Sequence, residues 1–324
     1  MYVFTKLVVS SQQELRNTLM RYIRQMLWLM VLTVALTACR QSSGEQNVVQ
    51  SATQEAETTS VSQEATFYNA EKAENAKKAD KKRPGGLEIP AALNRPELIL
   101  VRDGYTVSYN KDWKIANWVA WHLTKEHTYG HSDRSSIQFQ EDEDTPVGRA
   151  TNDDYWQSRY DRGHLCPAGD NRWDRRAHVQ SFLLSNVCPQ NRELNKGDWN
   201  DIEILCREWA RRYGEVYVVT GPVFYDGVKK TIGRNSVAVP DALFKVVLCT
   251  KNYARAIGFV VPNQGRHRDI RSYVTSIDDI EQMTGINFFP KLKPDTERRV
   301  EAAEQDDMVS DWGVKARYYH NFDN

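Results

Sequence analysis

The stretch from Tyr160 to Glu203 contains the residue types that phosphoryl chemistry requires. It reads YDRGHLCPAGDNRWDRRAHVQSFLLSNVCPQNRELNKGDWNDIE, with arginines, histidines and many side-chain amides. A neutral imidazole can accept a proton from water, arginines can neutralise a phosphate, and amide or carboxylate oxygens can hold a hard cation. Singly, an amide on a turn usually satisfies backbone groups. Together, these residues indicate cleavage of a phosphodiester.

Several short motifs in this stretch follow one another in a fixed order. They are Asp161-Arg162-Gly163-His164, Ser185-Asn186, Pro189-Gln190, Leu194-Asn195, Gly197, Trp199 and Glu203. This order resembles the signature of the DNA/RNA non-specific endonucleases, a family with a ββα-metal core. Further segments that resemble the family are Trp118-Val119-Ala120, Arg134, Val218–Pro222 and Val239–Lys245. The resemblance extends over residues 95–290.

The resemblance implies a base and a metal ligand. His164 resembles the general base that takes a proton from the attacking water. The unperturbed imidazole pKa of about 6.5 predicts that activity falls below about pH 6, or lower if Arg134 and Arg162 disfavour the imidazolium. Asn195 resembles the single protein ligand of a magnesium ion, with manganese as the alternative. Water and phosphate oxygens would complete the coordination of that ion.

The resemblance also implies supporting roles around these two residues. Arg134 and Arg162 resemble the cations that face the phosphate, and Glu203 resembles the carboxylate that holds the waters of the metal. Asn186 resembles a residue that supports the site. Asp161 is better interpreted as a structural neighbour than as a metal ligand. The basic cluster at 172–176 either touches the nucleic-acid backbone or is surface charge at the start of a helix.

The function implied is metal-dependent hydrolysis of DNA and RNA without strong sequence or sugar specificity, leaving 5′-phosphate ends. Contacts made mainly to phosphate carry no sequence information, which fits such a lack of specificity. One alternative is a non-catalytic surface lipoprotein that binds DNA, although such a protein would need neither His164 nor Asn195. Another is a phosphodiesterase for a different phosphoester, which the site residues alone do not distinguish.

The elements around this stretch predict an α+β fold with an antiparallel sheet and packed helices. β-branched and aromatic runs lie before it at 97–102, 105–109 and 117–123, and after it at 216–220, 237–239, 243–249 and 254–261. Three helices are expected at 175–184, 198–213 and 276–284. In the second, apolar residues recur at steps of three and four from Trp199 to Tyr213.

Composition excludes several classes of protein. Lys+Arg and Asp+Glu both number 43, so no global field favours or excludes nucleic acid as a partner. The strongest apolar run, MLWLMVLTVALTA at 26–38, is shorter than the roughly 20 residues of a membrane span. A polytopic membrane protein is therefore not expected.

The N-terminal segment predicts export and lipid anchoring. Leu36-Thr37-Ala38-Cys39 resembles the lipobox of bacterial lipoproteins, in which the signal is cleaved before the cysteine and the thiol receives a lipid. Residues 1–38 are then a signal peptide, with Met20 as the alternative start. Residues 39–86 form a disordered tether and 87–324 the endonuclease domain. The domain would lie in the cell envelope, facing the periplasm or the outside.

The remaining cysteines leave two interpretations open. Cys166, Cys188, Cys206 and Cys249 are an even number in an expected oxidising compartment, which permits two disulfides. Cys166 and Cys188 lie within the motifs, where a bridge would join the two segments that carry them. The alternative is four buried free thiols.

Overall fold

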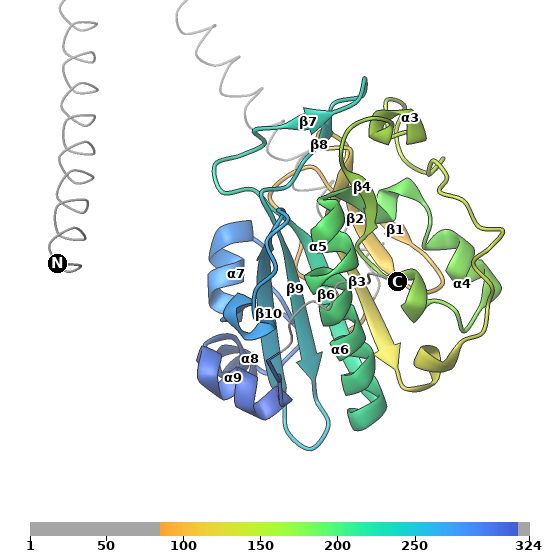
Figure 1. Ribbon diagram of the computed structural model, residues 1–324. Coiled ribbons are helices and arrows are strands. Elements are labelled where there is room, and N and C mark those ends of the chain that lie inside the picture. The colour runs from red at the N-terminus through yellow and green to blue at the C-terminus, as the bar shows by residue number, and fades with distance from the viewer. Residues whose placement is uncertain (1–84, 317–324) are drawn as a thin grey trace, which may run out of the picture. The chain divides into compact units, whose positions relative to one another are not determined.

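The computed structural model of the protein describes residues 85–316 (Figure 1). The predicted signal peptide, Cys39 and nearly all of the tether lie outside the described residues. Between residues 85 and 316, no helix is both long and apolar enough to cross a membrane.

A seven-stranded antiparallel sheet forms the centre of this part of the chain. Its order is β1 (Leu98–Val101), β2 (Thr106–Asn110), β3 (Ile115–Thr124), β6 (Glu215–Val223), β9 (Ala242–Cys249), β10 (Arg255–Pro262) and β11 (Val274–Thr275). Six of the predicted runs are strands of this sheet. The seventh, at 237–239, contributes β8 (Val237–Ala238), which pairs with β7 (Thr231–Ile232). The predicted α+β class with an antiparallel sheet is confirmed.

Both faces of the central sheet are buried. Strand β9 is buried along its whole length, which explains the nearly continuous apolar run LFKVVLC. On one face, Val218 and Val247 pack in the same core as Trp199 and Ile202. On the other face, Val219, Val246 and Phe244 belong to a second core, which includes Ile277 and Ile280.

Helix α6 (Asp198–Tyr213) covers the first face and matches the predicted range. Trp199, Ile202, Cys206 and Trp209 are buried at the predicted helical spacing, so their stripe faces the sheet. The helix ends at Gly214, whose φ of 93° is readily adopted only by glycine.

Helix α7 (Ile277–Thr284) covers part of the second face and is also confirmed. The hydroxyl of Ser276 accepts a hydrogen bond from the backbone N–H of Asp279 at 3.1 Å, as expected of an N-cap. Gly285 follows the helix with a left-handed φ of 65°.

The helix expected at 175–184 is shorter than predicted. Helix α4 (Arg175–Gln180) ends early, and a 3-10 turn η3 (Leu184–Asn186) follows it. Side chains satisfy carbonyls at this end: the Ser181 hydroxyl donates to His178 O at 2.7 Å, and the Asn186 amide donates to Ser181 O at 2.8 Å. These bonds take the place of a further helical turn.

Two C-terminal helices, α8 (Pro294–Glu301) and α9 (Gln305–Trp312), were not predicted. Their sequences are mainly polar, and each buries only two side chains. A helix that buries so little has a weak apolar periodicity. The other short elements are α3 (Asn152–Tyr155), η1 (Glu126–Tyr129), η2 (Ala168–Asp170) and η4 (Ile270–Tyr273).

A small ββα unit lies beside the central sheet and carries the motif residues. Strand β4 (Asp161–His164) pairs antiparallel with β5 (Val187–Gln190), and α5 (Arg192–Lys196) and α6 follow. A Cβ on Gly163 would lie 2.0 Å from Cδ of Gln190, so a larger residue there would have to displace the buried Gln190 side chain. The β4–β5 pairing holds the backbone up to His164 in a fixed register.

Candidate active site

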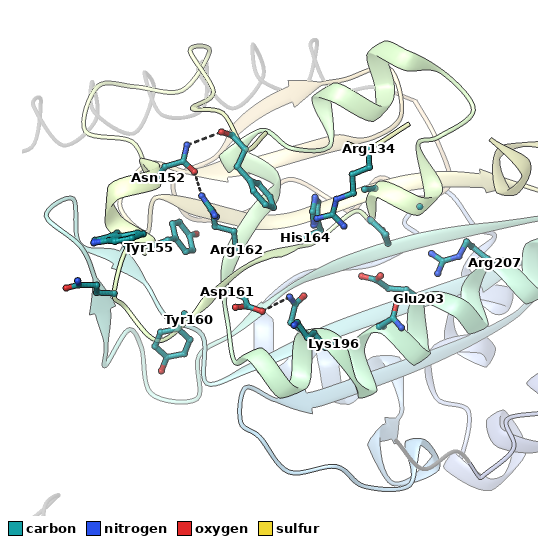
Figure 2. A pocket seen from close by; sticks show the side chains of 18 residues that line it. Arg134, Asn152, Tyr155, Tyr160, Asp161, Arg162, His164, Lys196, Glu203 and Arg207 are labelled. Carbon is teal, nitrogen blue, oxygen red and sulfur yellow. Dashed lines mark hydrogen bonds between the residues drawn. The ribbon is translucent and has the colours of Figure 1, made fainter. Parts of the chain in front are cut away.

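A cavity of about 840 Å³ opens at this ββα unit, and it gathers most of the predicted site residues (Figure 2). Its lining includes all five of the predicted base, metal-ligand, arginine and acidic positions, namely Arg134, Arg162, His164, Asn195 and Glu203. These residues come from a loop, from β4, from α5 and from α6. The sixth predicted residue, Asn186, is fully buried and does not line the cavity.

The His164 ring is held between two phenylalanines. Its centroid lies 5.1 Å from that of Phe139 and 4.9 Å from that of Phe182, with the second ring edge-on. Nε2 is enclosed and has no hydrogen-bond partner among the described residues. Because His164 lines the cavity and only Nε2 is enclosed in this way, Nδ1 is the nitrogen that the cavity can reach.

The surroundings of His164 keep its imidazole neutral. Burial and, to a smaller extent, the positive charge of Arg134 and the neighbouring His178 together lower its pKa to about 3. The predicted direction of this shift is correct, but burial is the larger cause and Arg134 the smaller. A neutral imidazole has a lone pair with which it can accept a proton.

The two phenylalanines also hold the two arginines. The guanidinium carbon of Arg134 lies 5.3 Å from the Phe182 centroid, and that of Arg162 lies 4.8 Å from the Phe139 centroid. Such cation–aromatic contacts fix the cation while leaving its N–H groups available. Within the described residues, neither arginine forms an ion pair. Their charge is thus available to an anion in the cavity.

A hydrogen-bond chain fixes Arg162 further. Its Nη1 donates to Asn152 Oδ1 at 2.6 Å, and Asn152 Nδ2 donates to Phe139 O at 2.9 Å. Figure 2 shows both bonds. The amide of Asn152, on α3, therefore connects the arginine to the backbone of the phenylalanine on which it rests.

The basic cluster at 172–176 holds the loop that carries Arg134. Arg172 Nε donates to Ser132 O at 3.0 Å, and Arg175 Nη1 donates to Asp133 O at 2.7 Å. Arg175 also donates to the Ser136 hydroxyl at 3.0 Å. Two of the three arginines in the cluster, Arg172 and Arg175, therefore have a structural role. This role is neither of the two that the sequence left open, contact with the nucleic-acid backbone or surface charge at the start of a helix.

On the α5 side of the cavity, Asp161 orients Asn195. The Asn195 Nδ2 atom donates to Asp161 Oδ2 at 3.2 Å. An ionised carboxylate only accepts hydrogen bonds, so the amide nitrogen must face Asp161 and the amide oxygen is left for another partner. Asp161 thus contacts the predicted ligand, as expected of a structural neighbour.

Glu203 lines the same cavity from α6. Burial raises its pKa to about 7, while the charges of Lys245 and Arg207 act in the opposite direction. The donor set of the cavity is therefore an amide oxygen and a carboxyl group, with space for water and phosphate. This set fits a hard cation such as Mg²⁺, which keeps several waters and takes few protein ligands.

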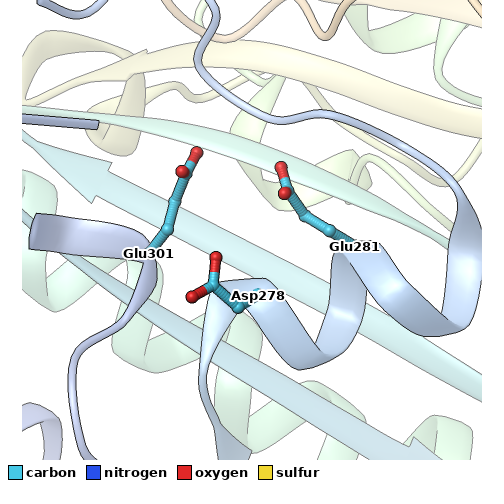
Figure 3. Close-up of side chains that lie close together, drawn as sticks. All are labelled: Asp278, Glu281 and Glu301. Atoms are coloured by element: carbon cyan, nitrogen blue, oxygen red, sulfur yellow. The ribbon is translucent and has the colours of Figure 1, made fainter. Parts of the chain in front are cut away.

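A cluster of three acidic side chains lies outside the cavity. Among the described residues, Asp278, Glu281 and Glu301 form the one set of three acidic, histidine or cysteine side chains with ligand atoms within 4.8 Å of one another (Figure 3). They belong to α7 and α8, and none of them lines the cavity.

Comparison with known proteins assigns the family. The DNA/RNA non-specific endonuclease family matches residues 90–295. The chain belongs to this family. It is 39% identical over 207 residues to mitochondrial nuclease EXOG of Xenopus laevis, a match that covers 59% of this chain and 58% of that protein. The chain thus spans less than two thirds of the length of the EXOG proteins that it matches.

Two further similarities extend over more of the matched proteins. The chain is 36% identical over 214 residues to nuclease C1 of Cunninghamella echinulata var. echinulata, covering 61% of this chain and 84% of that protein. A crystal structure of the EndoG/EndoGI complex matches with a TM-score of 0.58 and 30% identity, covering 61% of this chain and 89% of that chain. The expected non-specific endonuclease fold is confirmed.

The position of Asn186 fits the supporting role that the resemblance implies. Its Oδ1 accepts from the backbone N–H of Cys166 at 2.9 Å, and its Nδ2 donates to Cys166 O at 2.9 Å. The Asn186 amide therefore clamps the chain two residues beyond His164. This arrangement acts on the position of the imidazole rather than on a substrate.

Of the two interpretations of the cysteines, a disulfide between Cys166 and Cys188 is not the one found in residues 85–316. Cys166, Cys188, Cys206 and Cys249 are buried free thiols. The β4–β5 register places Cys188 opposite Gly163, so Cys166 lies past the end of the pairing. Its sulfur instead accepts a hydrogen bond from Asn171 Nδ2 at 3.2 Å. The interpretation as free thiols is therefore the correct one.

Several residues of the site were missed from the sequence. Phe139, Phe182 and Asn152 hold the base and the arginines, but apolar and amide residues of this kind occur throughout the chain. Lys245 does not line the cavity but acts on the pKa of Glu203, and the sequence marks it more clearly because it is a charged residue in an otherwise apolar strand. It is fully buried, with Nζ 4.4 Å from the Trp199 ring centroid.

Proposed function

We propose that the chain is a metal-dependent endonuclease that hydrolyses phosphodiester bonds of DNA and RNA and leaves 5′-phosphate ends. The observation that carries this proposal is the shared cavity, in which a neutral imidazole lies beside Arg134 and Arg162, neither of which forms an ion pair within residues 85–316. The family and the similarity to nucleases support the same class of reaction.

In this proposal His164 acts as the general base. Its Nδ1 accepts a proton from the water that attacks the phosphorus, and Phe139 and Phe182 keep the ring in place during that transfer. Arg134 and Arg162 bind the phosphate and neutralise the charge that develops on its oxygens. These contacts reach only the backbone of a nucleic acid, which fits a lack of strong sequence or sugar specificity.

Asn195 and Glu203 would hold the metal, Asn195 through its amide oxygen and Glu203 through water. Bound there, Mg²⁺ or alternatively Mn²⁺ supplies charge stabilisation at the phosphoryl and leaving oxygens. Asp161 keeps the Asn195 amide in the required orientation through its hydrogen bond of 3.2 Å.

The test is an assay of the purified full-length protein in detergent on single- and double-stranded DNA and RNA. Cleavage is expected with Mg²⁺, and it should disappear reversibly in EDTA. Full activity in EDTA would contradict the proposal. Binding of DNA without any cleavage would favour a non-catalytic surface protein, and cleavage restricted to small phosphodiesters would favour another phosphodiesterase.

We also propose that the chain is exported and anchored to a membrane of the cell envelope through a lipid on Cys39. The support is the lipobox-like segment Leu36–Cys39 and the apolar run before it. Replacing Cys39→Ser should release the protein from the membrane fraction or leave it unprocessed. Mass spectrometry that finds an unlipidated, soluble wild-type protein would contradict the anchor without affecting the proposed activity.

A further inference from the structure

An exposed tryptophan lies at the edge of the candidate active site. Trp156 is 77% exposed, more than any other large aromatic side chain between residues 85 and 316. It is also one of the residues that line the cavity of His164 and Arg162. An exposed indole at the edge of a cavity offers a large flat apolar face to whatever the cavity binds.

Hydrogen bonds to the buried Asp154 side chain fix the turn that carries Trp156. Asp154, two residues earlier, is buried and accepts hydrogen bonds from the backbone N–H and the hydroxyl of Thr151 at 2.8 and 3.0 Å. It also accepts from the backbone N–H and the side-chain amide of Asn235, at 3.0 and 2.9 Å. Tyr155 is buried against the core. The indole is therefore displayed by an anchored turn.

The same turn is connected to the proposed phosphate site. Asn152, on α3, accepts the hydrogen bond from Arg162 at 2.6 Å, and the helix ends directly before Trp156. Because Arg162 and Trp156 line the same cavity, a strand whose phosphate lies at Arg162 can extend toward the indole. The ring of Tyr160 lines the cavity as well, with Lys230 Nζ 4.8 Å from its centroid.

We propose that Trp156 is a stacking site for an unpaired nucleobase, so that the enzyme prefers single-stranded to duplex nucleic acid. This inference rests on the proposed nuclease function. Every base offers a flat face, and stacking on an aromatic side chain is tolerant of sequence. Inside a duplex both faces of a base are covered by its neighbours, so a duplex can use the indole only after a base is unstacked.

The kinetic test compares one oligonucleotide as a single strand and as a duplex. Replacing Trp156→Ala should raise KM for the single strand about 10-fold, with kcat within about 2-fold and duplex cleavage nearly unchanged. Trp156→Phe should restore most of the KM. Trp173→Ala is the matched control, because Trp173 is 37% exposed, stacks on His127 and does not line the cavity. Equal effects of Trp156→Ala on both substrates, or no effect, would overturn the proposal.

A binding measurement separates this proposal from the nuclease function. In EDTA, a single-stranded oligonucleotide should quench tryptophan fluorescence of the full-length protein, and Trp156→Phe should remove most of that quenching. Quenching in a protein that cuts nothing would retain the stacking site and reject the nuclease. Cleavage by a wild-type protein whose quenching is unchanged in Trp156→Phe would retain the nuclease and reject the stacking site.

Discussion

The candidate active site and the acidic corner, formed by Asp278, Glu281 and Glu301 of α7 and α8, surround a buried ionisable group with charges of opposite sign. At His164, burial and the positive charge of Arg134 lower the imidazole pKa to about 3. At Glu301, burial and the negative charges of Glu281, Glu297 and Asp278 raise the carboxyl pKa to about 8. Both environments favour the uncharged form of the group: His164 is neutral because it has lost its proton, and Glu301 is neutral because it keeps its proton.

The comparison shows that a shifted pKa does not by itself mark a catalytic group. Each of the two residues has a buried atom without a hydrogen-bond partner, Nε2 in His164 and Oε1 in Glu301. What distinguishes them is access, since His164 lines a cavity together with Arg134 and Arg162 and Glu301 does not. A chemical role requires both a suitable protonation state and a place for the substrate.

The largest effect is expected from removing the proposed base. His164→Ala should lower kcat by about 10²–10⁴-fold, while DNA binding changes little because Arg134 and Arg162 remain. Steady-state kinetics and a binding titration in EDTA would measure the two quantities. His122→Ala is the matched control, since His122 pairs with Glu215 outside the cavity. Near wild-type cleavage by His164→Ala would show that another group is the base.

A smaller loss is expected from disturbing the orientation of Asn195. In Asp161→Asn, the new amide can donate as well as accept, so the Asn195 amide oxygen is no longer directed away from it. We expect a 10–100-fold loss of activity that excess Mg²⁺ partly restores. A magnesium titration of activity checks this, with Asp307→Asn as control, because Asp307 is exposed and does not line the cavity. A loss that no Mg²⁺ concentration relieves would point to a role for Asp161 outside metal binding.

The sequence predicted the parts of the molecule whose stability comes from local patterns. Helix α6 was predicted because its stripe from Trp199 to Trp209 repeats with the helical period, and α7 because Ser276 and Gly285 mark its ends. Strands β4 and β5 were not predicted. Each has four residues, DRGH and VCPQ, and only the pairing with the other holds it in place.

The candidate site was located by resemblance, and its support was visible only in three dimensions. The motifs directed attention to His164, Asn195, Arg162 and Glu203, and the structure brings these residues to one cavity. The contacts of Phe139 and Phe182 with the base depend on segments folding together over 18 to 25 residues of separation, which no local pattern encodes. The sequence left the state of the cysteines open for the same reason, since strand register decides which cysteines face each other.

The pH dependence of kcat tests the environment of His164 directly. Because its pKa is lowered to about 3, the imidazole stays neutral from about pH 4 upward, and its protonation should not reduce kcat in that range. This prediction differs from the fall near pH 6 expected of an unperturbed histidine. A pH–rate profile in Mg²⁺ from pH 4.5 to 7.5 is the measurement. A fall of kcat with a midpoint near pH 6.5 in the wild type, absent from the residual activity of His164→Gln, would contradict the lowered pKa.

The smallest effect concerns the acidic corner and the stability of the fold. The pKa of Glu301 is raised from its model-compound value of 4.5 to about 8 in the folded state, so the folded protein holds this proton more tightly than the unfolded chain. The stability that this gives is fully present below about pH 4.5 and is lost as the pH rises through about 8.

Glu301→Gln imitates the protonated form at every pH. Its Tm relative to wild type should therefore increase from pH 5 to pH 8 by a few degrees, on the order of 1 kcal/mol for a domain of this size. Thermal unfolding at both pH values, with the exposed Glu304→Gln as control, measures the difference. A Tm difference that does not change with pH would mean that Glu301 ionises as readily in the folded protein as in the unfolded chain, and the contrast with His164 would then be lost.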